Sequence, residues 1–298
     1  MTRALPWSHT LLALAVVTVW GSNFVVIRYA LDTLPPLTMA ALRFALAFFP
    51  AALWFARPRV PLRQLAAYAM LIGVAQFGLL YIAMRSSISP GLASLVVQTQ
   101  VFFTIGLAMV IERERVQRFQ LVALALALAG LAMIAMRSRA VGGTPAGIAM
   151  VLAGALAWAG GNIIGRRAGR VDMLGYVVWS SAFAAPPLTA LAFVFEGPAA
   201  IAQGIAQAGP ATWLAVAWQA FANTLFGYAA WGWLLARHPA ATVAPWSLGV
   251  PVIGMASSAL LLGEPMPAWK LAASALVMTG LGVIVFWPRL REQLRARA

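Results

Sequence analysis

The run from Ala93 to Glu112, ASLVVQTQVFFTIGLAMVIE, constrains the fold of this chain more than any other stretch. Its roughly 20 residues, at ~1.5 Å each, can cross a ~30 Å hydrocarbon layer as one helix. Gln98, Thr99 and Gln100 lie in the middle of the run. Carboxamides near the centre of a bilayer are costly when they face lipid, so at least one glutamine should face a neighbouring helix or a wet cavity. The alternative is that both only join helices through hydrogen bonds.

Similar apolar runs fill nearly the whole chain. Hydrophobic residues make up 62% of the 298 residues and charged residues only 9%, whereas about a quarter of a soluble domain is charged. These values predict an all-α integral membrane protein without a separate soluble domain. The absence of cysteine excludes disulfides and thiol chemistry. The net charge of +14 comes from arginines at the ends of apolar runs, which indicates topology signals and no nucleic-acid partner.

The runs predict ten transmembrane helices, at about 9–30, 36–56, 64–84, 91–111, 118–136, 144–165, 174–195, 211–236, 241–262 and 268–287. With both termini in the cytoplasm, 15 arginines fall in cytoplasmic segments and only four basic residues fall outside. Cytoplasmic loops carry the excess of Lys and Arg. The sequence therefore predicts a multi-pass protein of a bacterial-type inner (plasma) membrane, with both termini cytoplasmic.

The two halves of the chain are similar to each other. LVVQTQVFFTIGLAMVIERE (95–114) overlays SLGVPVIGMASSALLLGEPM (247–266) with an offset of 152 residues. Each half would hold five spans, and an odd number inserts the second copy upside down. We therefore predict two inverted five-helix repeats, residues 1–139 and 140–298, with the substrate path at their interface near the middle of the bilayer.

These strings, together with VWGSNFVVIR (19–28), LPPLTMAALRF (34–44), WAGGNIIGRR (158–167) and GYAAWGWLLAR (227–237), resemble the drug/metabolite transporter superfamily with two EamA-type domains. Within it they are most similar to bacterial EamA-type exporters of cysteine, O-acetylserine and related amino-acid metabolites. Related YddG-type exporters carry aromatic amino acids. The resemblance covers essentially the whole chain. It implies a carrier that exports small molecules by alternating access, without ATP hydrolysis.

The sequence contains no recognisable catalytic or metal-ligating set. It has two histidines and no phosphate-binding loop, and its seven acidic residues fall in loops or at span ends. We expect no enzymatic activity, metal or cofactor, and no obligate partner besides the small-molecule substrate and the lipid bilayer. A proton-coupled carrier commonly needs an ionisable group inside the membrane. We therefore also expect transport that a pH gradient does not accelerate.

Amides at depth lie beside aromatic rings in the first and sixth spans. Asn23 follows Trp20 by three residues and Asn162 follows Trp158 by four, so each pair projects from one helix face. An amide can hold an amino or carboxyl group while the neighbouring ring packs an apolar side chain. Ordinary packing is the alternative for each ring.

The same helical spacing recurs in two further spans. Phe77 and Tyr81 share a face of the third span, and Gln219, Asn223 and Phe226 are expected to share one in the eighth. Gln98 and Gln100 lie about 200° apart around a helix, so both can face one cavity only where that helix is locally unwound. The predicted substrate-binding residues are Asn23, Phe77, Tyr81, Gln98, Gln100, Trp158, Asn162, Gln219 and Trp246.

Five positions are predicted hinges. Pro245 and Pro251 lie six residues apart in the ninth span, and because proline removes a backbone hydrogen bond, this helix should kink or unwind there. Gly78, Gly160 and Gly232 are similar weak points in the third, sixth and eighth spans. Close helix packing through small residues is the alternative reading of a glycine.

The favoured function is export of amino acids, neutral and apolar, aromatic or cysteine-like, and of related metabolites. Two alternatives stay open. A broad carrier for drugs or lipophilic cations would favour a buried carboxylate. A membrane scaffold or enzyme without a transport path would have amides that pair among themselves and leave no cavity.

Overall fold

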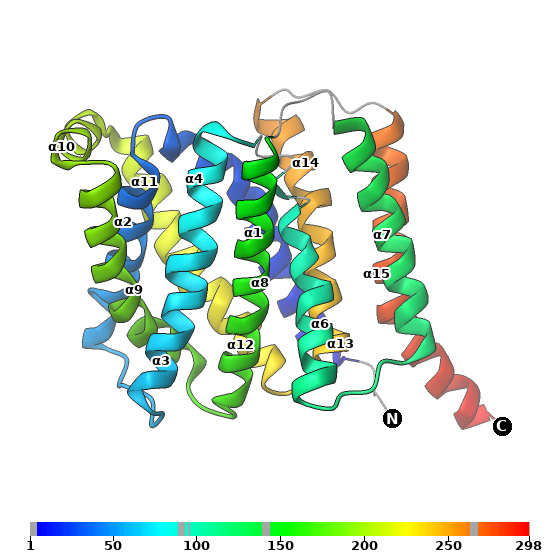
Figure 1. Ribbon diagram of the computed structural model, residues 1–298. Helices are drawn as coiled ribbons and strands as arrows, with labels where there is room; N and C mark the ends of the chain where they lie inside the picture. Colours follow the sequence, from blue (N-terminus) through cyan, green and yellow to red (C-terminus); the bar gives the residue numbers. More distant parts are fainter. Residues whose placement is uncertain (1–4, 89–92, 95, 139–143, 263–267, 298) are drawn as a thin grey trace.

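The computed structural model describes residues 5–88, 93, 94, 96–138, 144–262 and 268–297, and its regular structure is helical (Figure 1). A helical segment lies at each of the ten predicted spans. Six helices are long and apolar enough to cross a membrane, namely Trp7–Leu31, Pro36–Leu53, Leu62–Arg85, Pro145–Arg167, Met173–Phe195 and Ala240–Leu261. The protein is therefore an all-α integral membrane protein, as predicted.

The first half of the chain contains α1 (Trp7–Leu31), α2 (Pro36–Phe48), η1 (Ala51–Leu53), α3 (Leu62–Tyr68), η2 (Ala69–Phe77), α4 (Gly78–Ser86), η3 (Val97–Thr99), α6 (Gln100–Ile111) and α7 (Arg118–Ser138). The second half contains α8 (Pro145–Arg167), α9 (Met173–Phe195), α10 (Pro198–Gln207), α11 (Pro210–Trp218), η4 (Gln219–Tyr228), α12 (Ala229–Leu235), α13 (Ala240–Val243), η5 (Ala244–Gly249), α14 (Val250–Leu262) and α15 (Ala268–Arg297).

Local sequence explains where several helices begin. Pro36, Pro145, Pro198 and Pro210 each occupy a first-turn position, where proline loses no helical hydrogen bond and its fixed φ suits the helix. The Asp172 carboxylate accepts a hydrogen bond from the Leu174 N–H at 3.0 Å and so caps α9. These signals define the residues at which α2, α8, α9, α10 and α11 begin.

Two helices differ from the sequence-based boundaries. Helix α10 lies in the segment expected to be a loop between the seventh and eighth spans. It begins after Gly197, whose φ of +81° favours glycine. Its ten residues are too few to cross a bilayer. Helix α15 continues to Arg297, ten residues past the predicted end, because its polar C-terminal part is also helical. An apolar-run criterion detects neither feature.

The helices pack in a pattern that relates the two halves. Helix α2 packs against α9, and α7 packs against α15. Between these pairs, α1 packs on α14 and η4, while α8 packs on α6 and η2. The N- and C-termini lie at the same end of the bundle, which we call the termini end (Figure 1).

Two π-helical segments interrupt the long helices near the middle of the bundle. The segment η2 separates α3 from α4, and η4 separates α11 from α12. In a π-helix the backbone bonds close over five residues, so more residues fit in a turn than in an α-helix. Side chains after each segment therefore point in directions that a 3.6-residue period does not predict.

Candidate functional site

A cavity lies inside the bundle among α1, η2, α4, η3, α8, η4 and α14. Its lining includes four of the nine predicted residues, Asn23, Phe77, Gln98 and Trp158. The volume of the cavity is about 30 Å³. That is room for about two water molecules. An amino acid therefore fits only if the lining helices separate.

Aromatic rings form much of the cavity wall. The Trp20 ring centroid lies 5.1 Å from that of Trp158 and 5.1 Å from that of Tyr228, and Phe77 lies 5.8 Å from Tyr228. Gly227 permits this packing, since a Cβ there would lie 2.4 Å from Trp20 Nε1. The wall is suited to an apolar or aromatic group.

Four buried polar atoms on the same wall have no hydrogen-bond partner among the described residues. They are the Gln98 Nε2, the Gln98 Oε1, the Gln76 Oε1 and the Trp158 Nε1. The Gln76 Nε2 donates to the Tyr228 hydroxyl at 2.8 Å, which fixes that amide. Leaving such atoms unpaired costs ~1–3 kcal/mol each. The two donors and two acceptors match what a carboxylate and an ammonium group need.

Gln98 and Gln100 lie in different surroundings. The backbone around Gln98 is the 3₁₀ segment η3, and α6 begins at Gln100. Gln98 lines the cavity, whereas the Gln100 Nε2 donates to the Ser247 hydroxyl at 2.6 Å. The Asn162 Nδ2 donates to the Thr104 hydroxyl at 3.1 Å and to the Gln100 Oε1 at 3.4 Å. We call Gln100, Thr104, Asn162 and Ser247 the amide cluster.

Arg43 is one of the residues that sequence reasoning missed. Its side chain, from α2, is completely buried. Its guanidinium donates four hydrogen bonds, which end on Thr224 Oγ1 (2.6 Å), Tyr81 Oη (2.7 Å), Gln219 Oε1 (3.0 Å) and Asn223 Oδ1 (2.6 Å). The guanidinium also lies over the Phe77 ring, 3.6 Å from its centroid. We call Arg43 and these four hydrogen-bond acceptors the arginine cluster.

Tyr81 and Gln219, two predicted site residues, belong to the arginine cluster behind the cavity wall. The Tyr81 hydroxyl donates to the Gln219 Oε1 at 3.0 Å, and the Gln219 Nε2 donates to the Asn23 Oδ1 at 2.5 Å. Asn23 therefore connects the cluster to the cavity. Sequence reasoning did not single out Arg43, which lies within the second predicted span, 36–56. The signal that could have singled it out is the cost of a charge at that depth.

The expectation that Phe226 shares a face with Gln219 and Asn223 is wrong. Phe226 is 39% exposed, whereas Gln219 and Asn223 are buried. The reason is that these residues lie in the π-helix η4, whose wider turn moves Tyr228 inward instead. Trp246, the last predicted site residue, is buried in η5 and does not line the cavity.

The predicted hinge positions lie at irregular or tightly packed backbone. Pro245 falls within the 3₁₀ segment η5, and Pro251 is the second residue of α14, so the ninth span changes helix type between them. Gly78 is the first residue after the π-helix η2. A Cβ at Gly160 would lie 3.1 Å from Leu71, and one at Gly232 would lie 2.4 Å from Met173. Their role in motion stays a prediction.

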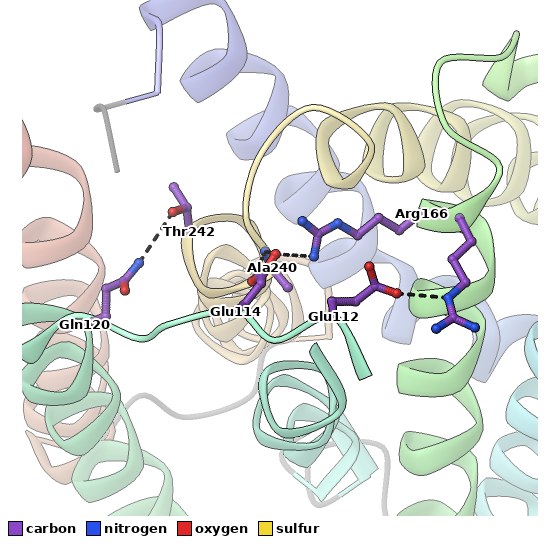
Figure 2. A network of polar contacts seen from close by, with 7 residues as sticks. Glu112, Glu114, Gln120, Arg166, Ala240 and Thr242 are labelled. Atoms are coloured by element: carbon purple, nitrogen blue, oxygen red, sulfur yellow. Dashed lines mark hydrogen bonds and ion pairs between the residues drawn. The ribbon is translucent and has the colours of Figure 1, made fainter. Parts of the chain in front are cut away.

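At the termini end, a polar network joins the α6–α7 connection to the second half (Figure 2). Glu114 lies between Arg166, with which it forms an ion pair, and the Ala240 N–H, which donates to its Oε2 at 3.0 Å. Glu112 pairs with Arg167 at 2.9 Å. The Gln120 Nε2 donates to the Ala241 carbonyl at 3.0 Å. The network ties α6 and α7 to α8 and α13.

Comparison with known proteins identifies the family. The EamA-like transporter family matches residues 7–136 and again residues 145–286. A "Probable amino-acid metabolite efflux pump" of Salmonella typhimurium is 42% identical over 95% of this chain and 97% of its own length, and that of Escherichia coli K12 is 40% identical over the same shares. A crystal structure 20% identical in sequence has a TM-score of 0.71 over 97% of this chain and 100% of its own, which establishes the fold alone. The chain belongs to the EamA-like transporter family.

Proposed function

We propose that this protein exports neutral amino acids and related small metabolites across a bacterial inner membrane. The observation that carries the proposal is the set of unpaired buried polar atoms of Gln98, Gln76 and Trp158 on a wall of aromatic rings. A zwitterion satisfies both the donors and the acceptors, while its side chain packs against the rings. The names of the two efflux pumps, which match over nearly their full length, support the same substrate class.

The exporter works as two inverted repeats with both termini in the cytoplasm. Two consecutive family matches, one in each half, support the repeat. The packing partners also support the repeat, because each half contributes a helix that packs on the other half. Helix α1 of the first half packs on η4 and α14 of the second half, and helix α8 of the second half packs on η2 and α6 of the first half. The loops with Arg57, Arg59, Arg113, Arg115 and Arg170 lie at the termini end, which the excess of positive charge assigns to the cytoplasm.

The exit path runs between α1 and α4, away from the termini end. A second cavity, of about 280 Å³, is lined by Arg28, Leu31, Asp32, Met84 and Arg85. Ile27 and Leu80 line the central cavity and lie one helical turn before Leu31 and Met84. One layer of apolar side chains therefore separates the two cavities.

Alternating access opens this apolar layer and the network of Figure 2 in turn. The Glu112 and Glu114 contacts hold the termini end closed, so substrate enters from the cytoplasm only after they separate. The π-helices η2 and η4 and the 3₁₀ segments η3 and η5 are the places where the helices bend. No nucleotide is required.

The test is counterflow into liposomes that contain the purified protein and an excess of unlabelled amino acid. Labelled leucine, phenylalanine and cysteine are supplied outside. We expect saturable accumulation of at least one of them over protein-free liposomes, and a reduction by unlabelled competitor. Accumulation equal to that of protein-free liposomes for the whole panel would contradict the proposal.

The path can be tested separately because the chain lacks cysteine, so any introduced cysteine is unique. Leu80→Cys lies on the apolar layer of the proposed path, and Gln203→Cys provides a control on an exposed side chain of α10, a helix too short to cross the bilayer. We expect substrate to change the labelling rate of the cysteine at position 80 by a membrane-impermeant maleimide and to leave that at position 203 unchanged. Equal rates with and without substrate at both positions would argue against the path.

A further inference from the structure

We infer that Arg43 makes this transporter select substrates that carry a carboxylate. The inference rests on the proposed function and names the feature of the substrate that the site requires. A completely buried guanidinium is costly in a membrane protein unless a charge or several hydrogen bonds stabilise it. The four acceptors around Arg43 are all neutral: two amides and two hydroxyls.

No described acidic side chain is available to neutralise Arg43. Each one lies at a helix end or in a connection between helices and has a partner of its own there. Asp32 pairs with Arg28, Glu112 with Arg167 and Glu114 with Arg166. Asp172 caps α9, and Glu196 accepts the Leu37 and Thr38 N–H groups at the start of α2. The interior of the described structure therefore holds a fixed positive charge without a counterion.

The charge is one side chain away from the central cavity. Asn223 and Phe77 both touch Arg43 and both line the cavity. A guanidinium has five N–H donors, and the four hydrogen bonds to described residues leave one Nη2 donor unused. Among the described residues, only Asn223 Oδ1 accepts from Nη2. A carboxylate in the cavity can take the place of that amide oxygen.

This exchange replaces a neutral acceptor with a charged one. Hydrogen bonds between a guanidinium and a carboxylate are roughly twice as strong as neutral ones, and a low-dielectric site strengthens them further. The Asn223 amide group, released from Arg43, can turn its NH₂ toward the second carboxylate oxygen. The unpaired Gln98 Oε1 and Gln76 Oε1 remain to accept from the substrate ammonium group.

The same geometry excludes cations without a carboxylate. An amine would bring a second positive charge beside Arg43 with nothing to compensate it. A net-neutral zwitterion places its carboxylate beside Arg43 and its ammonium group beside the amide oxygens of Gln98 and Gln76. The site therefore distinguishes an amino acid from its amide, which has the same size and shape but no negative charge.

The test compares the binding of L-leucine and L-leucinamide to the purified protein by isothermal titration calorimetry. We expect the wild-type protein to bind leucine at least about tenfold more tightly, a difference of about 1.4 kcal/mol. Asn223→Asp supplies a carboxylate 2.6 Å from Nη2 without changing side-chain size. Gln219→Glu supplies one 3.0 Å from Nη1 at a residue that does not itself line the cavity. Both variants should remove the preference for leucine.

Asn162→Asp is the matched control, because it makes the same substitution at a buried asparagine that contacts no arginine in the structure. We expect it to keep the preference for leucine. Equal binding of leucine and leucinamide by the wild-type protein would overturn the inference and leave amino-acid export standing. An unchanged preference in both Asn223→Asp and Gln219→Glu would also overturn it. Failure of the wild-type protein to bind or transport any amino acid would overturn both proposals.

Discussion

The arginine cluster and the amide cluster are two buried polar groups that differ in charge. Each joins helices of both halves: the first connects α2 and α4 to η4, and the second connects α6 to α8 and η5. Arg43 is the eighth residue of α2, and the eighth residue of α9 is Ser180. The two halves therefore have similar helix arrangements, but the second half has no arginine at the position that corresponds to Arg43. A site between them has one charged side and one neutral side, which suits a molecule with distinct ends.

Removing the charge is expected to have the largest effect. Arg43→Leu leaves four buried acceptors without their donor, and each stranded group costs ~1–3 kcal/mol before local relaxation. We expect the free energy of unfolding to fall by about 3 kcal/mol and flux per inserted molecule to fall more than about 100-fold. Chemical denaturation in detergent and counterflow measure the two quantities.

Gln100→Leu is the control within the amide cluster, and it should lower the free energy of unfolding by about 1 kcal/mol. A loss for Arg43→Leu no larger than this would show that the charge is not what distinguishes the two clusters.

The second prediction separates a cavity amide from a cluster amide. Gln98 has no hydrogen-bond partner among the described residues, so Gln98→Leu removes no bond within the protein. It should leave the melting temperature unchanged or raise it, while the loss of a bond to substrate, worth ~1–3 kcal/mol, weakens binding roughly 5- to 150-fold. Gln100→Leu should do the reverse, lowering the melting temperature with little change in normalised flux. If both variants behave alike, the assignment of Gln98 to the cavity fails.

The third prediction concerns the two asparagines that the sequence presents as equivalents. Asn23 accepts from Gln219 at 2.5 Å and lines the cavity, whereas Asn162 makes two longer bonds outside it. Asn23→Leu should therefore lower the free energy of unfolding by about 1–2 kcal/mol and also reduce flux. Asn162→Leu should lower the free energy of unfolding by about 0.6 kcal/mol and leave flux unchanged. Melting temperature and flux per inserted molecule test this ranking, and a larger flux defect for Asn162→Leu would reverse it.

The smallest effect should come from outside both clusters, since neither contains a histidine or a carboxylate. At the termini end, His9 Nδ1 lies 2.7 Å from His238 Nε2. The pKa of His238 is lower than its usual value of 6.5, mainly because the side chain is buried. Electrostatic repulsion from His9 and Arg237 lowers the pKa further. The neutral form is thus favoured in the folded protein, so the stability from this contact is present above pH 6.5 and is lost as the pH falls through the lowered pKa.

We expect the melting temperature of the wild-type protein to fall slightly more between pH 7.5 and pH 5 than that of His238→Asn. An identical decrease in the two proteins would show that this contact does not respond to pH.

The sequence was sufficient for the fold because long apolar runs between arginine clusters leave few alternatives to membrane helices. It also singled out Trp158, Asn23 and Gln98, polar or amphipathic groups at depth that line the candidate cavity. It could not predict η2 and η4, since π-helical turns have no period that separates them from an α-helix in one sequence. The misplacement of Phe226 follows directly from this.

Arg43 was missed for a different reason. Its partners are 38 to 181 residues away in the chain, so no local spacing brings them together. Their convergence depends on the packing of α2 against η4, which is a property of the assembled bundle. Gln76 and Tyr228 escaped notice similarly, as their hydrogen bond joins positions 152 residues apart.

The long final helix has a practical consequence for imaging. At ~1.5 Å per residue, the 30 residues of α15 extend about 45 Å, which exceeds the ~30 Å hydrocarbon layer. The helix continues past Pro288, an interior proline, and its last part turns outward from the bundle at the termini end (Figure 1). A 31.6 kDa protein embedded in a micelle offers few features for aligning electron micrographs. A helical fiducial domain fused in register with α15 would extend this helix and carry the orientation of the bundle into the solvent, where single particles can be aligned on it.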